Sequence, residues 1–249
     1  MPLLPKTPYR LILTPAYSIL PSSFPVLLHP LFISRDMQIT KDNIRKELLQ
    51  TAERIFMQKG FLKTSMREIA DVSCVGLSNI YNYFKSKDEI FCEIVKPVTQ
   101  AFEITLQKHH GSGRQDMNNM WSPDYLRQTT EEYLRIINRH GRLMELLLFR
   151  SQGSSLEKFK EQFTGHSTAL VKEHAKRMRN EHPGLKLHVS DFTIHLHTVW
   201  MFSLLEECIL YHPAPDEQER IVTEYVAFEL AGWLSLIHIS EPTRLRCIS

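Results

Sequence analysis

The sequence contains few of the features that mark a catalyst or a disulfide-bonded secreted protein. It has four cysteines among 249 residues, and no two of them stand in a C-x-x-C or other paired spacing. This usage is typical of reduced thiols in a cytoplasmic protein. The chain also lacks a glycine-rich phosphate loop, a G-x-S-x-G motif and an H-E-x-x-H motif. We therefore expect no enzyme activity, no cofactor and no metal centre.

Twelve histidines are the residues most able to hold a metal, but their spacing is unsuitable. His195 and His197 are two positions apart on an expected helix, so they point to different sides. His174, His182 and His188 have no partner in a ligand register. We interpret the histidines as ordinary side chains rather than as a metal site.

The two ends of the chain do not resemble parts of a globular fold. Residues 1–36 hold seven of the thirteen prolines, and no charge falls between Arg10 and Arg35. A signal peptide or membrane anchor is the alternative, but prolines interrupt the apolar stretches. We interpret 1–36 as a non-native or disordered leader before a true start at Met37. The tail 234–249 (LSLIHISEPTRLRCIS) is typical of a translated sequencing adaptor, with an ordinary amphipathic extension as the alternative.

The most informative stretch is 65–89, SMREIADVSCVGLSNIYNYFKSKDE. Two capping boxes, each a serine followed three residues later by a glutamate, predict helix starts at Ser65 and Ser86. A tight turn separates the first of these helices from a short one expected over 77–84. The order of elements is therefore helix, turn, short helix, and then the start of a long helix.

The short helix has an inner and an outer face of different chemistry. Leu77, Ile80 and Phe84 stand at i, i+3 and i+7 and share one buried side. The outer residues are Ser78, Asn79, Tyr81, Asn82 and Tyr83. They include no carboxylate, so this helix can enter the major groove of DNA without repelling the phosphates. The net charge of the whole chain is only +2, so the argument for DNA depends on this placement.

These motifs resemble the DNA-binding head of the TetR-type transcriptional regulators. The resemblance is carried by three segments in the expected order: GF at 60–61, TSMREIA at 64–70 and IYNYFKSKDEI at 80–90. It covers roughly residues 40–92. Two positions depart from the pattern, since Cys74 stands where the family usually has a turn glycine and Gly76 where it usually has a helix-capping serine.

The resemblance implies roles for individual residues. Those expected to read bases are Ser78, Asn79, Tyr81 and Asn82. Asparagine amides suit adenine edges, and a serine hydroxyl can pair with several bases. Those expected to bind backbone phosphates are Thr64, Ser65, Tyr83 and Lys87, the first two at a helix N-terminus.

The rest of the sequence predicts an all-α protein, with an N-terminal three-helix head on a C-terminal helical bundle that dimerises. We expect a DNA-binding domain over 37–86 and a ligand-binding and dimerisation domain over 87–233. The expected helices cover 37–59, 86–108, 123–139, 143–149, 156–180, 190–211 and 216–233. Gly141 is expected to break one helix, and Pro97 to kink another or divide it in two. The last two helices carry surplus apolar surface, which favours a symmetric four-helix interface between subunits.

The resemblance also implies a ligand pocket among the middle helices. The candidates are Met144, Phe149, Phe163, Met178, Trp200 and Met201, with plain core packing as the alternative for each. The leading hypothesis is a homodimeric repressor that binds a palindromic operator in double-stranded DNA and is released by an unknown small-molecule effector, with no membrane partner. The alternatives are a DNA-binding protein whose bundle docks a partner protein, and a helical enzyme or carrier with a coincidental head.

Overall fold

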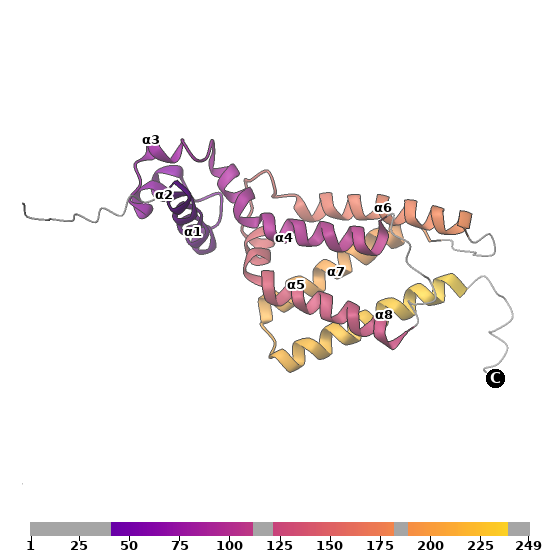
Figure 1. Ribbon diagram of the computed structural model, residues 1–249. Helices are drawn as coiled ribbons and strands as arrows, with labels where there is room; N and C mark the ends of the chain where they lie inside the picture. Colours follow the sequence, from indigo (N-terminus) through magenta and orange to yellow (C-terminus); the bar gives the residue numbers. More distant parts are fainter. Residues whose placement is uncertain (1–40, 112–121, 182–188, 239–249) are drawn as a thin grey trace, which may run out of the picture. The chain divides into compact units, whose positions relative to one another are not determined.

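The computed structural model describes residues 41–111, 122–181 and 189–238, which form eight α-helices and no strand (Figure 1). The predicted all-α fold is confirmed. The helices are α1 (Lys41–Lys59), α2 (Met66–Ser73), α3 (Leu77–Ile80), α4 (Lys87–His110), α5 (Pro123–Phe149), α6 (Phe159–Glu181), α7 (Asp191–Tyr211) and α8 (Pro215–His238).

Helices α1 to α3 and the start of α4 form the head, which packs around an aromatic core. The rings of Phe56, Phe61 and Phe91 lie in mutual contact, with centroids 5.7, 5.4 and 5.2 Å apart. All three side chains are buried, and each contributes on the order of 2 kcal/mol by leaving water. Phe91 belongs to α4, so the core of the head extends beyond the domain boundary predicted at residue 86.

Side-chain caps set the starts of two helices as predicted. Ser65 Oγ accepts a hydrogen bond from the Glu68 backbone at 3.2 Å, and Ser86 Oγ accepts one from the Glu89 backbone at 3.1 Å. Gly60 ends α1 with a φ of +79°, a conformation that favours glycine. The predicted helix starts at Ser65 and Ser86 and the glycine stop are confirmed.

The turn between α2 and α3 places a non-glycine residue in the left-handed region. Cys74 has φ 54° and ψ 25°, whereas Gly76 has a φ of −54°. A Cβ in this region costs roughly 1–2 kcal/mol, because it approaches the following carbonyl oxygen. The turn therefore has the geometry that suits glycine at the position where this chain has Cys74.

The second helix of the motif is shorter than predicted. Regular α-helix covers only Leu77–Ile80, and the chain continues through residues 81–83 as a tight turn. Ile80 O accepts from Tyr83 N at 2.9 Å and from Phe84 N at 3.0 Å. These two hydrogen bonds to one carbonyl keep the chain in a helix-like turn. Ile80 and Phe84, which the helical spacing predicted to face inward, are therefore still buried, at most 1% exposed.

Helix α5 corrects the prediction of two separate helices around Gly141. It runs unbroken from Pro123 to Phe149 through that glycine. A helical glycine costs about 1 kcal/mol relative to alanine, and the packing of α5 against α4, α7 and α8 outweighs that cost. Helix α4 likewise continues through Pro97, where the missing N–H removes one backbone hydrogen bond.

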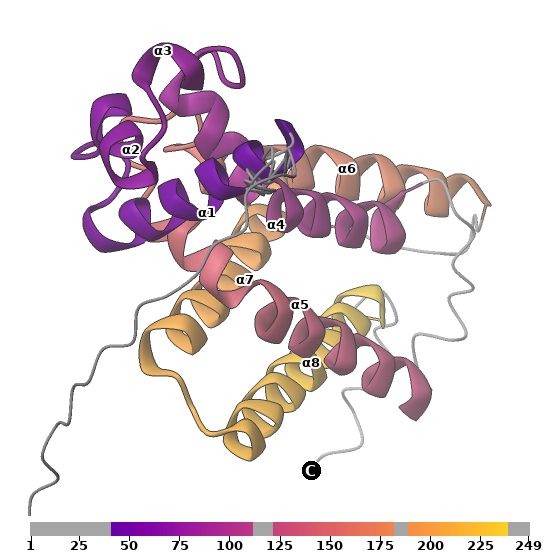
Figure 2. The same ribbon diagram turned by 60° about the vertical axis from the view of Figure 1, so that its left-hand side comes forward.

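The C-terminal bundle comprises most of α4 together with α5 to α8. Four phenylalanines form its aromatic centre, with ring centroids 5.5 to 6.4 Å apart: Phe102, Phe159, Phe163 and Phe202. Helix α5 packs on α8 (Figure 2). Helix α6 packs on α7. None of the helices described here combines the length and the apolar character that crossing a bilayer requires.

Some predictions fall outside the described residues. These are the leader at 1–36, the histidines 182 and 188, and the tail from residue 239. Helix α8 begins at Pro215 and runs to His238, so helical structure continues five residues past the predicted end at Trp233.

Candidate DNA-binding surface and effector cavity

The exposed side of α3 and its following turn carries the predicted base-reading residues. Ser78, Asn79, Tyr81 and Asn82 are all exposed, and the Tyr81 ring retains half of its accessible surface. Their neighbours Ile80 and Phe84 are buried in the head. The fold therefore presents the polar set to solvent as one group.

The two asparagines on this surface are coupled. Asn82 Nδ2 donates to Asn79 Oδ1 at 3.2 Å. This bond leaves the second N–H of Asn82, its carbonyl oxygen and the Asn79 amide nitrogen available to an outside partner. The hydrogen bond thus partly fixes the orientation of both side chains before any partner binds.

The predicted phosphate contacts divide between surface and interior. Ser65 is exposed at the N-terminus of α2, where its hydroxyl hydrogen remains available after it caps the helix. Tyr83 is half-buried against the core of the head. Thr64 is only 3% exposed and donates its hydroxyl hydrogen to Gly60 O at 2.8 Å. We therefore assign Thr64 a structural role at the end of α1 rather than a surface contact.

Lys87 is also engaged inside the head. Its ammonium donates to Phe61 O at 2.8 Å and to Thr64 O at 2.7 Å, and it lies 4.0 Å from the centroid of the Phe61 ring. Burial lowers the pKa of Lys87, while the nearby Asp88 carboxylate opposes that shift. Two of its three N–H donors therefore hold the segment between α1 and α2.

Other basic residues of the head differ in how accessible they are. Arg45 forms a two-pronged ion pair with Glu93 and lies over the Phe84 ring, so its guanidinium is used within the protein. The exposed basic side chains near the helix-turn-helix are those of Lys63, Arg67 and Lys85. These three residues were not among the phosphate contacts predicted from the sequence, because residue spacing alone does not show which of the neighbouring polar groups are buried.

Comparison with known proteins agrees with this geometry. Residues 48–94 match the family model of the bacterial regulatory proteins, tetR family. The chain carries a TetR-type helix-turn-helix head. The matched segment includes most of α1, all of α2 and α3, and the first turns of α4, so it overlaps the head defined by packing.

Curated relatives of the TetR-type head are transcriptional regulators. QacR of Staphylococcus aureus is 25% identical over 96 residues, which cover 39% of this chain and 51% of QacR. The repressor KstR2 of Mycolicibacterium smegmatis is 36% identical over 52 residues, which cover 21% of this chain and 25% of KstR2. The chain thus spans about half or less of the curated relatives that it matches.

Solved structures resemble this chain over a longer stretch. A TetR-family regulator from Syntrophomonas wolfei superposes with a TM-score of 0.55 at 15% identity, covering 78% of this chain and 97% of that one. NalD of Pseudomonas aeruginosa, the secondary repressor of the MexAB-OprM efflux pump, gives a TM-score of 0.51 at 17% identity, covering 77% and 96%. At these identities the likeness establishes the shared fold.

The bundle contains a cavity of about 120 Å³ between α4, α5, α6, α7 and α8. Of the six predicted pocket residues, Phe163 and Met201 line it. Trp200 instead lines a groove on the outer side of α7 and α8, and Met178 lines neither. Met144 is fully buried in the core, and Phe149 at the end of α5 is exposed.

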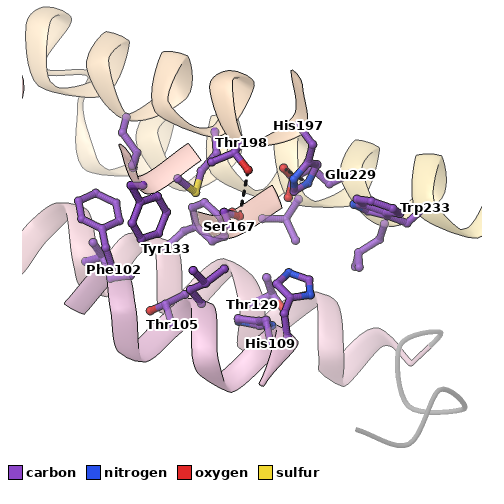
Figure 3. A pocket seen from close by; sticks show the side chains of 18 of the residues that line it. Phe102, Thr105, His109, Thr129, Tyr133, Ser167, His197, Thr198, Glu229 and Trp233 are labelled. Atoms are coloured by element: carbon purple, nitrogen blue, oxygen red, sulfur yellow. Dashed lines mark hydrogen bonds and ion pairs between the residues drawn. The ribbon is translucent and has the colours of Figure 1, made fainter. Parts of the chain in front are cut away.

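The histidines and the single carboxylate of the cavity lie toward one end, here called the polar end. Figure 3 shows His109, His197, Glu229 and Trp233 grouped there, with Phe102 at the other end. Between them, the hydroxyls of Ser167 and Thr198 are hydrogen-bonded at 3.1 Å. The cavity is therefore amphipathic along its length.

Two acidic side chains stand near this polar end. Glu132 Oε2 lies 2.5 Å from Lys108 Nζ and 3.2 Å from His109 Nε2. Burial acts to raise the pKa of Glu132, but the hydrogen bonds from His109 and Lys108 and their charges lower it to about 2. Glu229 accepts a hydrogen bond from the Tyr225 hydroxyl and lies 2.8 Å from His197 Nε2.

The cavity residues His109, His197, Glu229, Tyr125 and Trp233 were not selected from the sequence. They come from four different helices, and the sequence shows no spacing that joins them. The one available signal was the apolar character of α7 on more than one face, which implies burial of two sides. In the described ranges, no group of three or more histidine, cysteine or acidic residues is arranged to hold a metal ion.

Proposed function

We propose that this chain is a dimeric, sequence-specific DNA-binding repressor that is released by a small ligand in its cavity. The observation that carries the proposal is the exposed, carboxylate-free face of Ser78, Asn79, Tyr81 and Asn82 on a TetR-type head. Amide and hydroxyl groups on a short helix match the hydrogen-bonding edges of bases in the major groove. The names of QacR and KstR2, a regulator and a repressor, support the same role.

The phosphate contacts that we propose follow from exposure. Ser65 and Tyr83 remain from the sequence-based set, and we add the exposed Lys63 and Lys85. Thr64 and Lys87 are left out because their polar groups are hydrogen-bonded inside the head.

A dimer is supported by the outer face of α7 and α8. Large apolar side chains on these helices are exposed: Phe192, Leu196, Trp200 and Phe228. The rings of Trp200 and Phe228 are in edge-to-face contact at 5.0 Å. An apolar patch of this kind on neighbouring helices is typical of an interface. A two-fold dimer of such heads would bind half-sites about 34–36 Å apart or a multiple of that.

DNA binding tests the proposed function. Band shifts with the promoter region of the chain's own gene should show a complex that requires a palindrome. Asn79→Ala and Tyr81→Ala should each weaken specific binding by about 1–3 kcal/mol, roughly 5- to 150-fold, while non-specific binding changes little. Gln100→Ala, at an exposed site on α4, is the matched control. Equal losses on specific and non-specific DNA would contradict base reading.

The oligomeric state tests the dimer separately. Sedimentation should give twice the mass of the chain, and Trp200→Glu with Phe228→Glu should give monomers that bind a half-site weakly. A wild-type monomer that captures another protein through this face would favour the partner-docking alternative.

A further inference from the structure

The cavity has one carboxylate in its wall and no basic side chain of lysine or arginine. Glu229 is the acidic residue that lines it, and its side chain is 9% exposed. A carboxylate withdrawn from water is costly unless it is paired. Within the described residues, the ion-pair partner of Glu229 is His197 alone.

The neighbouring Glu132 is a carboxylate in this bundle whose charge is balanced by basic partners. It has both Lys108 and His109 within ion-pair distance. Glu229 has the Tyr225 hydroxyl and the edge of an imidazole instead. Unlike Glu132, therefore, Glu229 has no lysine or arginine as an ion-pair partner among the described residues.

The contact between His197 and Glu229 is incomplete. His197 Nε2 lies 2.8 Å from Glu229 Oε1, but the ring geometry does not meet the requirements of a hydrogen bond, and this nitrogen is buried without a hydrogen-bond partner. The rings of His197 and Trp233 are in edge-to-face contact at 5.2 Å. The Tyr225 hydroxyl and His197 Nε2 both approach Glu229 Oε1, beside the Trp233 ring that contacts His197.

Several of the other titratable groups around this end are uncharged near pH 7. On α4, burial and the neighbouring histidines His109, His174 and His197 lower the pKa of His110 to about 3, so it is neutral near pH 7. On α5 and α8, burial raises the pKa values of Tyr125, Tyr133 and Tyr225, so their hydroxyls stay protonated. Besides Glu229, the titratable side chains that line the cavity or contact Glu229 are His109, His110, Tyr125, Tyr133, His197 and Tyr225.

We propose that the effector of this cavity is a small amphipathic organic cation, with its ammonium group at Glu229 and its apolar body directed toward Phe102 and Met201. The inference rests on the proposed ligand response of the regulator. Trp233 and Tyr125 supply aromatic walls that favour a cation over an anion. The volume of about 120 Å³ suits a ligand with roughly one aromatic ring.

Three probes that differ in charge test the proposal on the full chain. They are 2-phenylethylamine, 2-phenylethanol and phenylacetate, with binding followed at pH 7.5 by calorimetry. The amine should bind at least about tenfold more tightly than the alcohol, because an ion pair shielded from water outweighs a neutral contact, and phenylacetate should bind most weakly. Glu229→Gln keeps the acceptor for Tyr225 and should reduce the preference for the amine to about twofold or less.

Glu132→Gln is the matched control, since it removes a nearby carboxylate that has its own basic partners. It should keep the preference for the amine. The proposal is overturned if the alcohol or the acid binds as tightly as the amine, if no probe binds, or if Glu229→Gln retains the full preference. A melting curve for each variant separates loss of folding from loss of recognition.

The two proposals fail in different ways. Palindrome-dependent DNA binding without any preference for the amine would overturn the cationic effector and leave the DNA-binding regulator in place. A preference for the amine that disappears in Glu229→Gln, in a chain that binds no DNA specifically, would overturn the regulator and leave the cation site in place.

Discussion

Asp88 at the start of α4 accepts two hydrogen bonds from Ser155, one from its backbone nitrogen at 2.8 Å and one from its hydroxyl at 2.7 Å. Ser155 lies between α5 and α6, so this pair joins the first turn of α4 to the loop that follows α5. A third bond from Phe61 N to Arg150 O, at 2.9 Å, adds to the junction. Because α5 also lines the cavity, this junction connects the cavity wall to the head.

Ser155→Ala tests the junction. Loss of a hydroxyl that donates to a carboxylate should lower the free energy of unfolding by about 1.5–3 kcal/mol, measured by urea denaturation. A double-mutant cycle with Asp88→Asn should show a coupling energy of at least about 0.5 kcal/mol. Gln152→Ala, exposed in the same turn, should change stability by less than about 0.5 kcal/mol. Additive losses in the cycle would mean that the two side chains act independently.

Cys74→Gly should stabilise the protein. Glycine adopts the φ of 54° without a Cβ clash, so the free energy of unfolding should rise by about 1 kcal/mol, allowing for the greater freedom of glycine in the unfolded chain. Cys74→Ala removes the thiol but keeps the Cβ, and it should leave stability nearly unchanged. If both variants gained equally, the thiol rather than the backbone conformation would be the cause.

Substitution of Lys87 should change the stability of the protein, whereas substitution of Lys85 should change its affinity for DNA. Lys87→Met breaks two bonds to backbone carbonyls and should lower the free energy of unfolding by roughly 1–3 kcal/mol. Lys85→Met should leave stability within about 0.5 kcal/mol, but it should reduce the slope of log affinity against log salt by about 1 if the lysine contacts a phosphate. The reverse pattern would place Lys87 on the DNA and remove Lys85 from the proposed contacts.

The stability of the protein should fall in mild acid because of His110. Burial and the nearby histidines lower its pKa from 6.5 to about 3, so between these values the unfolded chain binds a proton that the folded chain does not. The contribution of the neutral His110 to the free energy of unfolding is fully present above pH 6.5. It is lost as the pH falls toward 3, at a rate of up to about 1.4 kcal/mol per pH unit.

Urea denaturation between pH 7.5 and pH 5 measures this effect. His110→Phe should reduce the slope of stability against pH by up to one proton, whereas His195→Gln, at an exposed site on α7, should keep it. An unchanged slope in His110→Phe would assign the acid sensitivity to other groups.

The amino-acid sequence by itself determined the starts of α2 and α4, the end of α1 and the residues of the exposed face. Capping serines, the glycine that ends α1, and the spacing of Ile80 and Phe84 act within a few residues, so local rules were sufficient to predict them. The all-α class followed from the same periodicity.

Tertiary structure decided the features that depend on partners distant in the sequence. The continuity of α5 through Gly141 depends on packing against α4, α7 and α8, and the burial of Thr64 and Lys87 depends on neighbours in the folded head. The cavity joins His109 of α4 to Glu229 of α8, which are far apart along the chain. Helical periodicity states which side of a helix is buried, but only the packing of the helices decides which side chains meet there.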